Sequence, residues 1–105
     1  MTIKTISRVL GEALDGSLWF FCDGCDMPHS LNVGEGPGPR WGYNRNPEAP
    51  TFTPSVLARW SEGPAERVCH SFITDGRIQY LGDCTHALAS QTVDLPNWEE
   101  SWSEW

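Results

Sequence analysis

The chain has 105 residues, of which 39% are hydrophobic and 11% aromatic, and fourteen acidic against seven basic residues give a formal net charge of −7. This length predicts one domain over residues 1–105 with a modest core, and a bound metal commonly stabilises so small a protein. The acidic charge argues against nucleic acids and anionic membranes as partners, because both require a positively charged surface. No apolar run approaches the roughly 20 residues of a membrane span and no export leader is seen, so we expect a cytoplasmic protein.

The first third of the chain predicts short β-strands joined by turns. Alternating residues from Thr5 to Leu10 and from Ser17 to Cys22 indicate two strands, and Asp15-Gly16 between them is a hairpin signal. A short strand is expected from Ser30 to Val33. The glycine- and proline-rich residues 34–39 are then expected to form a loop.

The middle of the chain continues this β pattern. We expect an extended segment from Trp41 to Asn44 and a strand from Ser55 to Trp60. The clearest hairpin has strands from Arg67 to Thr74 and from Arg77 to Leu81, with Asp75-Gly76 as its turn. The sequence therefore predicts a mainly β fold, a small antiparallel domain with a zinc knuckle and short helical elements.

The helical elements are expected near the C-terminus. Residues 83–90 are predicted to form one or two helical turns with Asp83 as N-cap. In the acidic tail of residues 96–105, Trp98, Trp102 and Trp105 share one face of a predicted helix that begins near Asn97. We expect this face to dock on its own domain, and the alternative is a patch for self-association or for a partner.

All cysteines and histidines of the chain fall into three short clusters, which is the inventory of a metal site, a thiol active site, or both. A C-x2-C step around glycine turns two thiolates toward one point, as tetrahedral zinc requires. Disulfides are a weaker interpretation, because export to an oxidising compartment is not indicated. A redox C-x2-C motif is also disfavoured, since it belongs at a helix N-terminus after a strand. The clusters are Cys22-Asp-Gly-Cys25 with His29, then Cys69-His70, then Cys84-Thr-His86.

Strand periodicity separates two of these residues. Successive side chains of a strand point to opposite faces, so Cys69 and His70 are not expected to bind one metal ion together. If Cys69 joins Cys22 and Cys25 at the metal, His70 is left for another role.

The ordered motifs resemble a small domain family of unknown function. That family is common in phages and prophages, is sometimes misnamed ammonia monooxygenase, and has relatives beside bacterial ubiquitin-like conjugation genes that are proposed to be peptidases. The resemblance extends from about residue 21 to residue 96. It rests on Phe21-Cys-Asp-Gly-Cys-Asp-Met-Pro-His29, Pro50-Thr-Phe-Thr-Pro-Ser55, Cys69-His-Ser-Phe-Ile73, Asp75-Gly-Arg-Ile78, Asp83-Cys-Thr-His-Ala-Leu-Ala89 and Gln91-Thr-Val93.

The resemblance implies two sites and a host setting. Relatives often carry serine at the position of Cys84, which implies a nucleophile there, because serine is a poor zinc ligand. His70 or His86 then takes the thiol proton, and Asp83 or the other histidine orients this base. The chain is implied to be a zinc-stabilised cysteine- or serine-type hydrolase of a bacterial host cell, acting on a protein or peptide such as the tail of a ubiquitin-like protein. The implied zinc ligands are Cys22, Cys25, His29 and Cys69.

Other assignments remain open. Cys22, Cys25, Cys69 and Cys84 can instead form an inert four-thiolate zinc site. Histidines with one cysteine and an open position would form a catalytic zinc site, although no H-E-x-x-H helix supports it. Ser55 is a further candidate nucleophile. A non-enzymatic, zinc-binding phage accessory protein is the alternative function.

Overall fold

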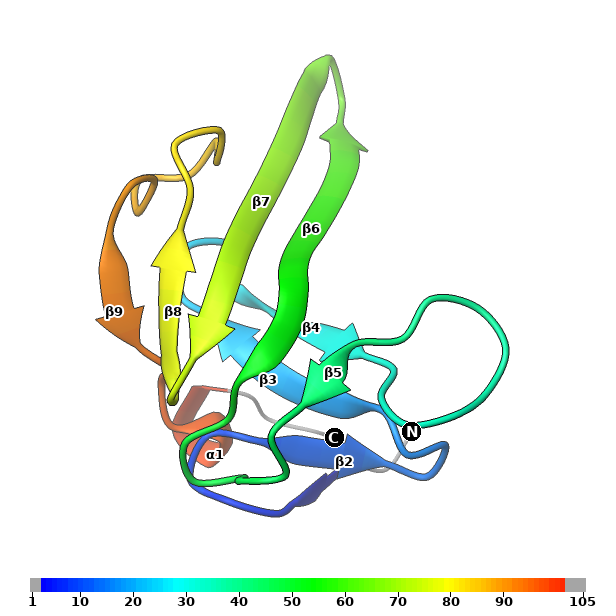
Figure 1. Ribbon diagram of the computed structural model, residues 1–105. Coiled ribbons are helices and arrows are strands. Elements are labelled where there is room, and N and C mark those ends of the chain that lie inside the picture. The colour runs from blue at the N-terminus through cyan, green and yellow to red at the C-terminus, as the bar shows by residue number, and fades with distance from the viewer. Residues whose placement is uncertain (1–2, 102–105) are drawn as a thin grey trace.

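The computed structural model describes residues 3–101, which form two antiparallel β-sheets and one short helix (Figure 1). This architecture confirms the predicted mainly β fold with a C-terminal helix. The first sheet has the strand order β1-β2-β3-β4 and the second β5-β6-β7-β8-β9. The elements are β1 (Ile3–Thr5), β2 (Gly11–Ala13), β3 (Leu18–Cys22), β4 (Met27–Leu31), β5 (Gly42–Tyr43), β6 (Phe52–Glu62), β7 (Ala65–Thr74), β8 (Arg77–Tyr80), β9 (Thr92–Asp94) and α1 (Trp98–Ser101).

The hairpin at Asp15-Gly16 is confirmed, but the strand predicted before it is misplaced. Strand β2 precedes the turn, whereas residues 6–10 form a bend between β1 and β2. The Ser7 hydroxyl accepts hydrogen bonds from the backbone N–H groups of Val9 and Leu10, at 3.2 and 3.1 Å. This local bonding competes with the strand ladder that the alternating pattern indicates.

The second sheet contains the long β6–β7 hairpin, which extends beyond the rest of the molecule (Figure 1). The predicted hairpin at Asp75-Gly76 joins β7 to β8, and the φ angles of 51° and 79° at these residues suit a tight two-residue hairpin turn. The strands predicted around this turn are confirmed.

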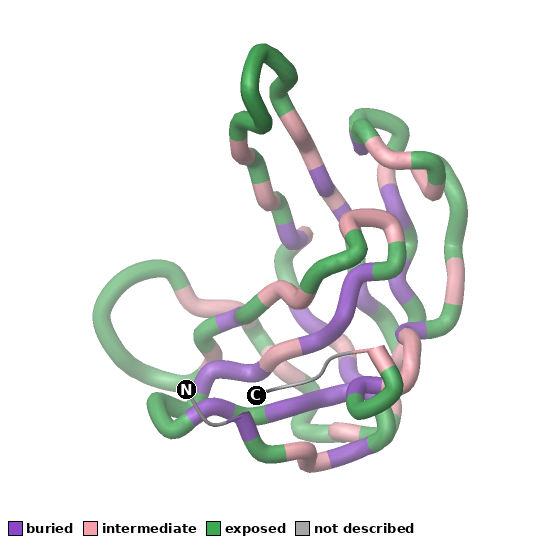
Figure 2. The backbone as a smooth tube through the Cα atoms, turned by 180° about the vertical axis from the view of Figure 1, so that it is seen from behind, coloured by how far each residue is buried: buried purple, intermediate pink, exposed green. Residues whose placement is uncertain are grey.

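The largest cluster of buried side chains contains residues of both sheets, and Figure 2 marks the buried positions along the backbone. Strand β3 supplies Phe20 to this core from one face, and Phe21 packs on the opposite face in a smaller cluster with Ile3, Ala13 and Trp98. Because β3 is covered on both faces, its sequence is almost continuously apolar instead of alternating.

The helical turns predicted for residues 83–90 are wrong. This segment contains bends and turns, and it runs beside β7. The Thr85 N–H donates to the Val68 carbonyl at 2.9 Å, and the Val68 N–H donates to the Thr85 hydroxyl at 3.0 Å. These bonds to a strand replace the bonds of a helix, and they leave the Asp83 carboxylate available to another partner.

The C-terminal helix α1 begins as the sequence predicts. The Asn97 side-chain oxygen accepts a hydrogen bond from the Glu100 N–H at 3.0 Å, which is an N-cap contact. Trp98 is buried, and its backbone N–H donates to the Arg8 carbonyl at 2.7 Å. Trp102 and Trp105 lie outside the described residues. Within those residues, no helix has both the length and the apolar character to cross a membrane.

Replacing Trp98 by alanine is expected to lower the free energy of unfolding by about 3–5 kcal/mol, because it empties the cluster between α1 and the first sheet. The matched control is Leu14→Ala, since Leu14 is 93% exposed. Urea denaturation of both variants measures the difference. An equal, small loss in the two variants would show that α1 contributes little to the folded state.

Candidate active site and metal centre

Four side chains from the two sheets meet in a group that can hold a metal ion. Cys22 ends β3, Cys25 lies in the turn that follows, His29 lies on β4, and Cys69 comes from β7. Their ligand atoms all lie within 4.8 Å of one another. The structure therefore brings together the complete set of predicted metal ligands, and the group links the two sheets.

The local geometry of this group suits zinc. The sulfur atoms of Cys22 and Cys69 are 3.8 Å apart, which matches two thiolates bound at about 2.3 Å in a tetrahedron. The Cys25 N–H donates to the Cys22 sulfur at 3.3 Å. His29 Nε2 is buried without a hydrogen-bond partner. A bound metal ion would satisfy this nitrogen.

The three thiols of this group affect one another's pKa values through hydrogen bonds. Hydrogen bonds from Cys25 and then Cys69 hold the pKa of Cys22 far below its usual range. The same bonding to Cys22 raises the pKa of Cys25 to about 12 and raises that of Cys69 further. These bonds stabilise a thiolate at Cys22, and binding of a metal ion would release the protons of the other thiols.

A second group shares Cys69 and adds Cys84 and His86, with ligand atoms again within 4.8 Å of one another. The His86 ring packs edge-on against Tyr80 with centroids 4.6 Å apart, and its Nε2 is buried without a hydrogen-bond partner. The ring also lies directly over Gly24, where any Cβ would overlap it. A side chain at position 24 would therefore displace the His86 ring, which gives glycine a packing reason at this position.

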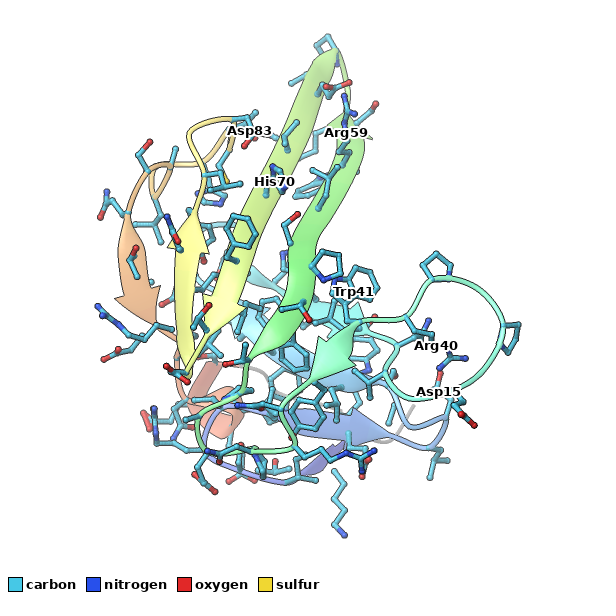
Figure 3. All side chains as sticks on the ribbon, viewed as in Figure 1. Asp15, Arg40, Trp41, Arg59, His70 and Asp83 are labelled. Carbon is cyan, nitrogen blue, oxygen red and sulfur yellow. The ribbon has the colours of Figure 1, made fainter. Side chains whose placement is uncertain are left out.

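His70 lies on the opposite face of β7 from Cys69, as strand periodicity predicts, and it joins two other side chains there. Its Nδ1 is 3.1 Å from the Asp83 carboxylate, and its Nε2 is 3.0 Å from the Ser55 hydroxyl. Figure 3 shows His70 on β7 with Asp83 beside it in the loop after β8. The order hydroxyl, imidazole, carboxylate is that of a Ser-His-Asp catalytic triad.

An irregularity in β6 positions Ser55. The ladder between β6 and β7 pairs Phe52 with Ile73 and then resumes with Val56 and Ser71, so β6 has extra residues in the interval. Leu57 pairs directly with His70, and Ser55, two residues earlier, lies on the same face. The Trp41 indole donates to the Ser55 carbonyl at 3.2 Å, which ties this part of β6 to the segment before β5.

Cys84 contacts His70 through the backbone only. Its sulfur accepts a hydrogen bond from the His70 N–H at 3.2 Å and lies 3.2 Å from the His70 carbonyl, to which the thiol donates. Cys84 is buried. Its role as nucleophile stays a prediction, and so does the role of His86 as base. The hydrogen bonds of the His70 imidazole instead favour Ser55, which the sequence ranked below Cys84.

The triad lies on an open face of the second sheet. The His70 and Asp83 side chains are 26% and 57% exposed. Two apolar side chains flank His70 on this face, because Leu57 is its partner across β6 and Phe72 is two residues along β7, and both are exposed. Such a face is accessible to a segment of another polypeptide.

A family model described as "Bacterial ubiquitination-like system serine protease (BubE)" matches residues 3–81 of the chain. The match contains Ser55, His70 and the four candidate metal ligands, and it ends two residues before Asp83. Comparisons with curated proteins and with solved structures gave no match.

Proposed function

The chain belongs to the family of bacterial ubiquitination-like system serine proteases, and we propose that it is a peptidase whose nucleophile is Ser55. His70 is the proposed general base and Asp83 the group that orients it. The single observation that carries the proposal is the hydrogen-bonded series from the Ser55 hydroxyl through the His70 ring to the Asp83 carboxylate. Cys84 is proposed to support the His70 backbone.

The reaction follows from the atoms in contact. Ser55 Oγ attacks the scissile carbonyl carbon while His70 Nε2 accepts the hydroxyl proton, and the protonated ring then donates this proton to the leaving amine. The acyl-serine ester is hydrolysed in the second half of the reaction, with His70 activating water in the same way. Asp83 accepts from Nδ1–H, which keeps Nε2 free to receive the proton and stabilises the imidazolium.

The metal centre is proposed to bind zinc in a structural role. Three cysteines and one histidine make a closed ligand set, without an open position for water, and bound zinc would supply a cross-link between the sheets. Cys69 precedes His70 on β7, so this cross-link would also hold the strand that presents the base.

The proposed substrate is a polypeptide of the ubiquitin-like conjugation system, such as the tail of its ubiquitin-like protein. The family description supports this substrate class. The partly exposed triad and the two apolar side chains beside His70 support it as well, since an open surface fits an extended polypeptide better than a small molecule.

Parallel substitutions test the nucleophile. Ser55→Ala is expected to lower kcat for an activated ester such as p-nitrophenyl acetate by at least about 10³-fold, whereas Cys84→Ser should retain most of the activity, because a hydroxyl can make both bonds to the His70 backbone. Zinc content and circular dichroism of each variant control for folding. Full activity in Ser55→Ala, or its loss only in a folded Cys84→Ser, would overturn the proposal.

A further inference from the structure

We infer that the free edge of β6, from Leu57 to Ser61, is the docking strand for an extended segment of the polypeptide substrate. The inference rests on the proposed function and adds the mode of substrate binding. It starts from the pairing of β6. On one side β7 pairs with β6 up to Glu62, but on the other side β5 pairs only with Phe52 and Thr53. In the described part of the chain, no strand pairs with residues 57–61 on that outer side.

The ladder shows which backbone groups face outward. In an antiparallel pair, residues alternate between bonding to one neighbour and to the other. The His70 carbonyl accepts from the Leu81 N–H on the β8 side at 2.9 Å, so the Leu57–His70 pair is one that does not bond across the β6–β7 ladder. Leu57, Arg59 and Ser61 therefore direct their N–H and C=O groups away from β7.

The backbone carbonyl of Ser55 also points away from β7. That carbonyl accepts the Trp41 indole N–H, which comes from the β5 side of the strand. The series of outward backbone groups thus begins at the proposed nucleophile and continues along β6. A strand added to this edge would run toward Ser55, whose carbonyl bonds the Trp41 indole; Figure 3 labels Trp41 at the side of β6.

The side chains on the catalytic face suit such an occupant. A strand added beside Leu57 presents alternate side chains to the face that carries Leu57, His70 and Phe72. Leu57 is 49% exposed and Phe72 43% exposed, and both are among the most exposed large apolar side chains of the described residues. We therefore expect the bound segment to carry apolar residues at alternate positions.

A proline at Arg59 removes one outward N–H without removing a β6–β7 hydrogen bond, because proline is tolerated where the N–H of an edge strand faces solvent. Arg59→Ala is the matched control, since it removes the side chain and its exposed ion pair with Glu66 but keeps the N–H. The probes are a fluorophosphonate, which reports Ser55 reactivity alone, and an internally quenched decapeptide with leucine at alternate positions, which reports docking as well.

With Arg59→Pro we expect kcat/KM for the decapeptide to fall about tenfold, as for the loss of one backbone hydrogen bond, while the rate of fluorophosphonate labelling is unchanged. Arg59→Ala should match the wild type in both assays. Decapeptides with one N-methylated bond each should show losses at every second position, because only alternate N–H groups of an added strand face β6.

The outcomes separate this inference from the proposed function. A wild-type protein that is not labelled at Ser55 overturns the proposed function. A labelled wild-type protein that cleaves no such decapeptide, or an Arg59→Pro variant that cleaves it as well as Arg59→Ala does, overturns the docking strand. Light scattering tests a further outcome. If the wild type is a dimer, and Arg59→Pro dissociates it without loss of cleavage, the edge binds a second copy of the chain and the docking strand is overturned.

Discussion

Replacing Cys69 by alanine is expected to abolish metal binding and to unfold the protein. Cys69 is the only one of the four grouped ligands that comes from the second sheet, so its loss disconnects the centre from β7. Structural zinc contributes on the order of 10 kcal/mol to folding, which equals the whole stability of a typical small domain. Elemental analysis and the far-UV circular dichroism spectrum of the purified variant measure the two effects.

The control for this prediction is Cys84→Ala. Cys84 falls in the second group, with Cys69 and His86, and the hydrogen bonds of its thiol go to the His70 backbone. We expect this variant to retain about one zinc per chain and a cooperative unfolding transition. Loss of zinc from Cys84→Ala, together with retention in His29→Ala, would instead support the four-cysteine site.

The second large effect is expected at the base. His70→Ala should lower kcat for an activated ester nearly as much as Ser55→Ala, because the Ser55 hydroxyl then has no proton acceptor in contact. Asp83→Asn should lower kcat by at least about tenfold, but by less than the roughly 10⁴-fold loss known for a buried triad aspartate. The reason is exposure, since water can partly replace the 57% exposed Asp83 carboxylate.

Asp94→Asn is a matched control for the removal of charge. The Asp94 carboxylate on β9 is 3.3 Å from the Arg77 guanidinium on β8, so it also forms an exposed ion pair. Strands β7 and β8 separate it from Ser55 on β6. Unchanged kcat in Asp94→Asn and a clear loss in Asp83→Asn are expected in steady-state assays. Equal activity of the two variants would remove Asp83 from the triad.

The parts of the fold that local sequence determines were predictable. Asp-Gly sequences favour hairpin turns, and the two hairpins at residues 15–16 and 75–76 are present. Asp75 and Gly76 both have positive φ, whereas in the first turn only Gly16 does. Asn97 capped a helix as expected. The group that can hold a metal ion was also predictable from its residue types, since cysteines and histidines at short spacings have few other roles in so small a chain.

The errors arose where other hydrogen bonds replace those of the predicted helix or strand. The pattern of residues 83–90 suits a helix, but Thr85 bonds to Val68 on β7 and the segment follows that strand. The alternation of residues 5–10 suits a strand, but Ser7 bonds to the next backbone N–H groups and makes a bend. The first competitor lies in a distant strand, so local sequence could not reveal it, whereas the second is a local bond that the alternating pattern does not encode.

The choice between Ser55 and Cys84 depends on register. Both residues lie near His70, and only the pairing of Leu57 with His70 shows that Ser55 faces the imidazole. The Cys84 sulfur bonds the backbone N–H of His70 instead of its imidazole ring. A bulge in β6 sets this register, and a proline-flanked Thr-Pro-Ser sequence does not by itself specify one.

The most direct test of the account is to map the adduct of a fluorophosphonate on the zinc-loaded wild-type protein. Peptide mass spectrometry should find one phosphonylated residue, Ser55, and labelling should be lost in His70→Ala and slowed in Asp83→Asn. An adduct on Cys84, or no adduct on a folded, zinc-loaded chain, would contradict the assignment of Ser55 as the nucleophile.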